Sequence, residues 1–182
     1  MNEMVEPTTS IHSVSREDAI EWIMEEYGES LKRFIFFYVK NRTQADDIFQ
    51  EVMITVYRKL DTFQERSTLK NWLYQITANK CKDYLRSPIH RFASWKDQAL
   101  EKSDEHTPEK SFIVDEQKRT VIENMMKLPV KYREVLILQY YKEFSIQEIS
   151  ELLKVNPSTV KTRIMRAKEK LKVTLKEEFL HE

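Results

Sequence analysis

The side chains with the clearest chemistry lie near the C-terminus, where positive charge is dense. Between residues 160 and 172 the bases are Lys161, Arg163, Arg166, Lys168, Lys170 and Lys172, opposed by Glu169 alone. Guanidinium and ammonium groups suit contacts with DNA phosphates and base edges. The apolar residues of this segment recur at helical spacing, as Val160, Ile164, Ala167 and Leu171. The pattern predicts a helix with one buried stripe and one cationic face.

A short helix and a tight turn should position this basic helix. One apolar helical face is predicted just upstream, formed by Ile146, Ile149, Leu152 and Leu153. Asn156 can cap the basic helix, and Pro157 fits its first position. Because the turn has no glycine, Lys154 or Asn156 must adopt any left-handed conformation. The two helices predict a DNA-binding helix-turn-helix; the alternative is an amphipathic pair with a merely solvated lysine face.

The composition of the whole chain favours helices. Its 182 residues include one glycine, Gly28, and five prolines, which is too few for the tight turns of β-hairpins. We expect an all-α fold of two small helical domains joined by a flexible linker, the second ending in the helix-turn-helix. The predicted ranges are a tail at 1–14, a domain at 15–87, a linker at 88–111 and a domain at 112–182.

Apolar periodicity and capping residues set the expected helix boundaries. Helices are predicted over residues 16–27, 29–40, 43–60, 68–86, 112–128 and 130–142, before the helix-turn-helix pair. Thr43, with Asp46 three residues later, is the expected N-cap of the helix at 43–60. Ser67 or Thr68 should cap the helix that follows.

Charge, cysteine content and motifs exclude several classes of function. The net charge is zero, but acids outnumber bases in residues 1–60 and bases outnumber acids in residues 61–91. Cys81 has no second cysteine and the histidines are scattered, so we expect no metal site. The chain has no phosphate-binding loop and no nucleophile motif, so we expect no cofactor and no enzymatic activity. The longest apolar run is too short for a bilayer, which predicts a soluble cytoplasmic protein without direct membrane insertion.

The predicted helix at 43–60 has an unusual polar face. Its inward stripe consists of Ala45, Ile48, Phe49, Val52, Val56 and Leu60. Roughly opposite lie Asp47, Gln50 and Glu51, with Ile54 among them. An isoleucine ringed by charges is a candidate interface anchor, but a stray apolar residue on a solvated face fits equally well.

The next predicted helix, at 68–86, carries a polar-to-basic ridge. Its members follow one another every three or four residues: Asn71, Gln75, Asn79, Lys82 and Arg86. Amides and bases in a row suit base-edge and phosphate contacts, although a solvated ridge would look similar. The preceding polar loop at 61–67 contains Phe63 and Arg66 and is a candidate to accept an unstacked base.

Two long stretches resemble the extracytoplasmic-function class of bacterial sigma factors. The sequences TQADDIFQEVMITVYRKLDTF and STLKNWLYQITANKCKDYLR resemble region 2 of that family. The sequence LPVKYREVLILQYYKEFSIQEISELLKVNPSTVKTRIMRAKEKLK resembles its region 4. The two resemblances occur in the family's order and cover most of residues 28–172. This implies a sigma factor that directs core RNA polymerase to promoter DNA of an alternative regulon.

The resemblance also implies roles for particular residues. The segment of Asp46, Asp47, Gln50 and Glu51, with Ile54 in or beside it, looks like the surface that docks on core RNA polymerase. The loop with Phe63 and Arg66 and the ridge from Asn71 to Arg86 would handle the −10 element, where a base is flipped out. The −35 element would be met by Lys161, Thr162, Met165 and Arg166, with Ser158 and Thr159 at the helix N-terminus near phosphate. An anti-sigma factor is the expected regulator.

The chain departs from the family at two places. Ser158 stands where the family often has glycine, and the exposed aromatic residues that melt promoters in larger sigma factors are not evident around Trp72 and Tyr74. The second departure implies that the protein melts promoter DNA weakly by itself.

Two other hypotheses for the function remain. One is a stand-alone helix-turn-helix regulator, although the sequence has no obvious dimer seam, and the other is a helical adaptor that binds only proteins.

Overall fold

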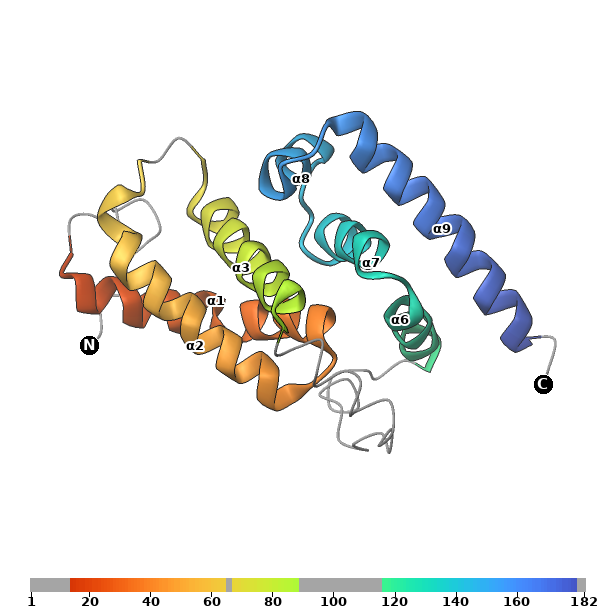
Figure 1. The fold of residues 1–182 in the computed structure, drawn as a ribbon, viewed down its shortest axis with the longest axis horizontal. Coiled ribbons are helices and arrows are strands. Elements are labelled where there is room, and N and C mark those ends of the chain that lie inside the picture. The colour runs from red at the N-terminus through yellow and green to blue at the C-terminus, as the bar shows by residue number, and fades with distance from the viewer. Residues whose placement is uncertain (1–13, 65–66, 89–115, 180–182) are drawn as a thin grey trace. The chain divides into compact units, whose positions relative to one another are not determined.

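A computed structural model describes residues 14–64, 67–88 and 116–179. Every regular element in these ranges is helical (Figure 1), which confirms the all-α fold. The chain divides into two compact units, Met1–Lys82 and Asp83–Glu182, and each is described by itself. The predicted tail at 1–14 and linker at 88–111 lie almost wholly outside the described residues.

The first unit is built on a helical hairpin. Helix α1 (Arg16–Val39) and helix α2 (Arg42–Lys59) pack against each other, and a short 3₁₀ turn, η2 (Leu60–Thr62), follows. The prediction of separate helices at 16–27 and 29–40 is wrong, because α1 runs through Gly28 without a break. Gly28 is buried, and the ring of Phe49 lies 3.6 Å from where its Cβ would be. Tertiary packing therefore outweighs the low helix propensity of glycine.

Of the N-caps predicted for the next two helices, the first is wrong and the second is confirmed. Asn41, not Thr43, is the N-cap of α2, and its Oδ1 accepts a hydrogen bond of 3.0 Å from the backbone N–H of Gln44. Thr68 caps helix α3 (Leu69–Arg86) as predicted, because its hydroxyl accepts from the N–H of Asn71 at 3.2 Å. Asn41 also allows the chain to turn directly after Lys40, whose φ of 58° closes α1.

The core of the first unit joins α3 to the hairpin. The ring of Tyr74 meets the ring of Phe34 edge-on with 5.0 Å between centroids, and its hydroxyl shares a 2.8 Å hydrogen bond with Ser30. Burial raises the pKa of Tyr74 to about 12, although the Ser30 hydrogen bond lowers it in part. The predicted inward stripe of α2 is buried throughout, and so is Cys81. The burial of the α2 stripe confirms the prediction made for that helix.

The second unit begins with α6 (Glu116–Lys127) and α7 (Val130–Leu136), which Pro129 separates as predicted. The prediction of one α-helix over 130–142 is wrong in its second half, where the backbone forms a π-helical turn, η3 (Ile137–Tyr141). This turn ends at Lys142, and Glu143 then takes a left-handed conformation with φ of 59°. The strained residue reverses the chain before the next helix.

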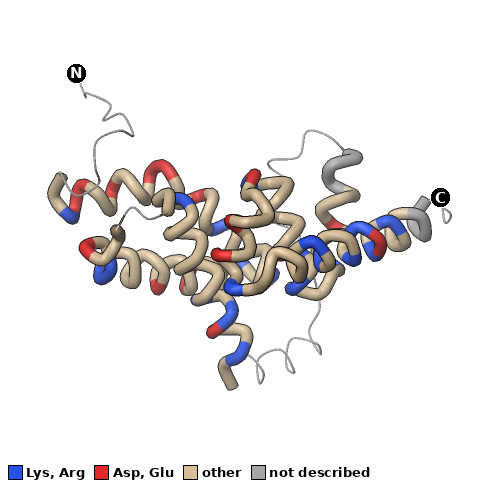
Figure 2. The backbone as a smooth tube through the Cα atoms, turned by 90° about the horizontal axis from the view of Figure 1, so that it is seen from above, with Lys and Arg blue, Asp and Glu red and all other residues tan. Residues whose placement is uncertain are grey.

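The helix-turn-helix is formed by α8 (Ile146–Leu153) and α9 (Pro157–Phe179), as predicted. Lys154 has φ of 55°, so it provides the left-handed turn residue in place of glycine. A full capping box between Ser145 and Glu148 starts α8, which the sequence analysis did not anticipate. The predicted stripe of α9 faces inward, with Val160 and Ala167 fully buried. Basic residues recur along α9 (Figure 2), and those opposite the stripe, such as Lys161, Arg166 and Lys172, are exposed.

Candidate functional site

The carboxylates on the polar face of α2 differ in exposure and in ion pairing. Asp47, Gln50 and Glu51 are exposed, while Asp46 is half-buried. Asp46 pairs with Lys32 at 3.6 Å, and Glu51 pairs with Lys80 of α3 at 3.4 Å. Among the described residues Asp47 forms no ion pair, so its charge is the most available to a partner.

An apolar spot lies beside these carboxylates. Ile54 is 51% exposed, and Tyr57, three residues later on the same face, is 40% exposed. Tyr57 is held in place because its hydroxyl donates to Glu17 at 3.1 Å and the guanidinium of Arg16 lies 5.2 Å above its ring. The sequence analysis missed Tyr57, although the i, i+3 spacing from Ile54 was a usable signal. The pair gives α2 an apolar anchor within an acidic face.

The ridge of α3 is partly open to solvent. Asn79 and Arg86 are exposed, and the other three members, Asn71, Gln75 and Lys82, are half-buried. All five share one helix, so the structure brings the predicted ridge together. Each member exposes at least part of its side chain to a ligand that approaches along α3.

The loop before α3 differs from the expectation of an exposed aromatic ring. Phe63 is 6% exposed, and its ring packs against Trp72 with 5.3 Å between centroids. In this conformation the Phe63 ring is covered and cannot stack on a base. Its packing on Trp72 instead anchors the start of the loop to α3. The burial follows from a contact with α3, which the local sequence does not reveal. Arg66 lies outside the described residues.

The first turns of α9 carry the residues predicted for the −35 element. Ser158, Lys161, Thr162 and Arg166 are exposed, Thr159 is half-buried, and Met165 exposes 54% of its surface. Because 161 and 165 are four apart and 162 and 165 are three apart, these side chains form one patch. The structure therefore brings together the whole predicted −35 set.

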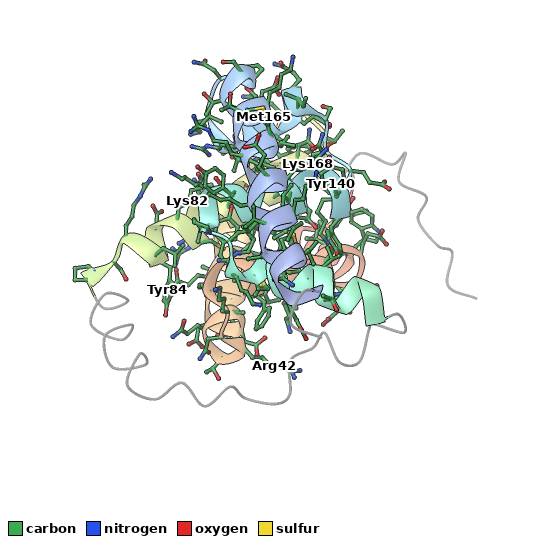
Figure 3. The ribbon with its side chains drawn as sticks, turned by 90° about the vertical axis from the view of Figure 1, so that its right-hand side faces the viewer. Arg42, Lys82, Tyr84, Tyr140, Met165 and Lys168 are labelled. Atoms are coloured by element: carbon green, nitrogen blue, oxygen red, sulfur yellow. The ribbon has the colours of Figure 1, made fainter. Side chains whose placement is uncertain are left out.

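Contacts within the second unit separate the basic residues of α9 into two groups. Arg163 binds Glu134 at 3.1 Å, and the ammonium of Lys168 lies 5.0 Å from the ring of Tyr140 (Figure 3). Lys161 and Arg166 make no ion pair or ring contact among the described residues. Lys172 is likewise exposed and makes no such contact among the described residues, but only Lys161 and Arg166 flank Met165.

A groove of about 290 Å³ runs beside the start of α9. Its lining comes from the first turns of α7 and α9, namely Lys131, Tyr132, Ser158, Thr159, Thr162, Arg163 and Arg166. Backbone N–H groups at the start of α9 and three cationic side chains give this groove a positive potential. Its charge suits an anionic ligand such as a phosphate chain that passes beside α9. The sequence analysis missed Lys131, which belongs to a different helix.

Two further observations concern the described residues as a whole. None of their helices is both long and apolar enough to cross a membrane. In residues 14–64, 67–88 and 116–179, no three His, Cys, Asp or Glu side chains converge as metal ligands.

A helix-turn-helix with an exposed cationic helix, on a chain with a second helical unit that exposes an acidic face, defines a two-part transcription factor. The family models agree, since Sigma-70 region 2 matches residues 23–88 and Sigma-70 region 4 matches residues 119–171. The chain belongs to the extracytoplasmic-function (ECF) RNA polymerase sigma factors. It is an RNA polymerase sigma factor for an alternative regulon, that is, a transcription initiation factor.

Several relatives support this assignment. The chain is 31% identical over 170 residues to the ECF RNA polymerase sigma factor SigW of Bacillus subtilis, covering 88% of this chain and 91% of SigW. It is 30% identical to the sigma factor SigV of the same organism, covering 85% and 90%. The fold is similar to RpoE in its complex with the anti-sigma factor NepR from Bartonella quintana, with a TM-score of 0.70, 23% identity and coverage of 86% and 96%.

Proposed function

We propose that three surfaces of this chain divide the work of promoter recognition. The face of Asp46, Asp47, Gln50, Glu51 and Ile54 on α2 binds core RNA polymerase, the ridge of α3 contacts the −10 element, and the exposed side of α9 contacts the −35 element. The observation that carries the proposal is the pair of unengaged cations, Lys161 and Arg166, on either side of Met165. Because neither cation makes an ion pair or ring contact among the described residues, both are available to DNA phosphates.

Polymerase docking is supported by the mixed chemistry of α2. A desolvated apolar anchor surrounded by charges is the usual composition of a protein interface hot spot. Ile54 and Tyr57 provide the anchor, and Asp47, which has no ion pair in the part of the chain that the structure describes, provides a charge for a basic partner surface. A face that contacts only water explains these residues less well, because leaving the apolar surface of Ile54 and Tyr57 in water brings no gain in free energy.

Contact with the −10 element is supported by α3 and the loop that precedes it. Asn79 and Arg86 are exposed, and amide and guanidinium groups can recognise base edges and phosphate. Phe63 acts indirectly in this proposal, because its packing on Trp72 fixes where the loop at 61–67 leaves η2. Arg66 of the same loop supplies positive charge for the strand.

Regulation by an anti-sigma factor is part of the proposal. The solved structures with similar folds include RpoE bound to the anti-sigma factor NepR and CnrH bound to the cytosolic domain of CnrY, at a TM-score of 0.64 and 22% identity for the latter. We infer that a comparable inhibitor covers exposed apolar positions such as Ile54 and Met165. The site of action is the cytoplasm, since core polymerase and the chromosome meet there.

The test is reconstitution with bacterial core RNA polymerase, followed by run-off transcription on a genomic fragment library. Stoichiometric binding and a discrete new set of transcripts are expected. Arg166→Glu should abolish these transcripts while polymerase binding is retained, and Lys172→Glu, an exposed position on the same helix, is the matched control. Sequence-specific duplex binding by the protein alone, without polymerase binding, would instead identify a stand-alone regulator.

A further inference from the structure

The recognition helix has an apolar centre. Met165 exposes 54% of its surface in the patch that also contains Lys161, Thr162 and Arg166, and it projects from α9 in Figure 3. A thioether carries no hydrogen-bond donor and cannot bind phosphate. A large apolar side chain at this place therefore has no role in the sequence-independent part of DNA binding.

Thr162 reinforces this apolar character. Its hydroxyl donates a 2.9 Å hydrogen bond to the backbone carbonyl of Ser158, one turn earlier on α9. The donor of Thr162 is therefore used inside the helix, and what it adds to an approaching surface is its methyl group and an acceptor oxygen. Since residues 162 and 165 are three apart, the methyl group and the thioether lie next to each other.

We propose that Met165, together with the methyl group of Thr162, reads the C5-methyl group of a thymine in the −35 element. This inference rests on the proposed function of α9. The thymine methyl is the apolar group that base edges present in the major groove, and side chains recognise it by apolar contact. Lys161 and Arg166, on either side, are the groups suited to phosphate or guanine. The patch thus combines apolar groups that recognise a thymine methyl with two cations that contact phosphate or guanine.

The experiment exchanges thymine for deoxyuridine at each thymine of the −35 element, one position at a time. This substitution removes one methyl group and leaves base pairing intact. Transcription by the reconstituted holoenzyme is then measured on matched templates. Removing one buried methyl contact should lower initiation about fourfold at one or two positions.

Variants of the protein locate the contact. Met165→Ala should lower initiation on the thymine template and abolish the difference between thymine and deoxyuridine at the affected position, as in a double-mutant cycle. Lys161→Ala should lower initiation on both templates by the same factor. Val173→Ala removes another exposed apolar side chain of α9, which is 56% exposed, and should change neither the activity nor the ratio. Met165→Gln, of similar length, should shift the preference at that position towards adenine.

The outcomes separate this inference from the proposed function. A −35 element without thymine, a lack of sensitivity to deoxyuridine, or a sensitivity that persists unchanged in Met165→Ala would overturn methyl reading while the sigma activity stands. Transcription that does not depend on a −35 element, or no transcription at all, would overturn the proposed function of α9 as well.

Discussion

Arg163 of α9 and Glu134 of α7 form an ion pair whose carboxylate is almost completely enclosed. The Nη1 to Oε1 distance is 3.1 Å, and 3% of the Glu134 side chain is exposed against 25% for Arg163. The pair joins the recognition helix to the helix that precedes the helix-turn-helix. Its geometry helps to fix how α9 is rotated about its axis, and hence which of its residues are exposed.

Removing the guanidinium should therefore destabilise the second unit. Arg163→Met keeps the aliphatic stem but leaves the Glu134 carboxylate enclosed without this partner, which should cost about 3 kcal/mol in the free energy of unfolding. Urea denaturation measures the change. Arg166→Met, at an exposed position of the same helix, should stay within about 0.5 kcal/mol of the wild type. Equal effects of the two variants would refute a structural role for the pair.

The raised pKa of Tyr74 predicts that the first unit weakens in alkali. Burial raises this pKa to about 12 in the folded protein, while an unfolded tyrosine titrates near its ordinary value of 10.0. Between these values the folded state holds a proton that the unfolded state has lost. Stability is thus fully present below pH 10 and falls as the pH rises towards 12, by about 2–3 kcal/mol in total.

The variant that isolates this effect is Tyr74→Phe. It should lose some stability at pH 7, because the hydrogen bond with Ser30 is removed, but its stability should fall less steeply between pH 10 and 12. Unfolding followed by circular dichroism across this range gives both slopes. Parallel slopes for the two proteins would show that Tyr74 is not the group responsible.

Glu143 predicts a stabilising substitution. Its φ of 59° is costly for a residue with a side chain, so Glu143→Gly should raise the free energy of unfolding by about 0.5–1 kcal/mol. Glu169→Gly, in the exposed interior of α9, should have the opposite sign at about 1 kcal/mol. Thermal melts of the two variants, measured in parallel, test the prediction. A loss of stability in both would contradict it.

Gly28 offers a second stabilising substitution of different origin. It lies inside α1, and an added Cβ would meet the Phe49 ring at 3.6 Å, an ordinary contact distance. Gly28→Ala should stabilise α1 by about 1 kcal/mol through helix propensity. Gly28→Leu is the contrasting variant, since its larger side chain would collide with the α2 packing. Chemical denaturation should show opposite changes for the two.

Asp47 is the sharpest probe of polymerase docking. Because it forms no ion pair among the described residues, Asp47→Lys changes the face of α2 without breaking an internal contact. We expect a loss of affinity for core polymerase of at least about tenfold. Glu25→Lys, an identical charge change at an exposed position of α1, is the control. An unchanged affinity for Asp47→Lys would remove α2 from the docking surface.

The sequence predicts those features that depend on neighbours a few residues away. The stripes of α2 and α9 follow from local spacing. Local sequence also limited the cap of α3 to Ser67 or Thr68 and the left-handed turn residue to Lys154 or Asn156, and the structure has Thr68 and Lys154. The errors arise where distant residues decide. The burial of Phe63 depends on Trp72, and the continuity of α1 through Gly28 depends on packing against Phe49. Such contacts leave no periodic signal.

The candidate sites show the same division. Helical spacing was enough to place Lys161, Thr162, Met165 and Arg166 in one patch. It could not show that Arg163 and Lys168 are occupied by Glu134 and Tyr140, because those partners belong to other elements. The distinction between occupied and available cations therefore required the tertiary structure.

The ion pair between Glu51 and Lys80 couples two surfaces that have been treated separately. A basic partner that takes Glu51 must compete with the Lys80 ammonium, which lies at 3.4 Å on α3 next to Asn79. Once displaced, Lys80 adds a positive charge to the helix proposed to contact the −10 element. The exchange is worth at most about 1 kcal/mol, but linkage makes it reciprocal. In the proposed assembly, binding to the polymerase and engagement of the template would therefore each favour the other to the same modest extent.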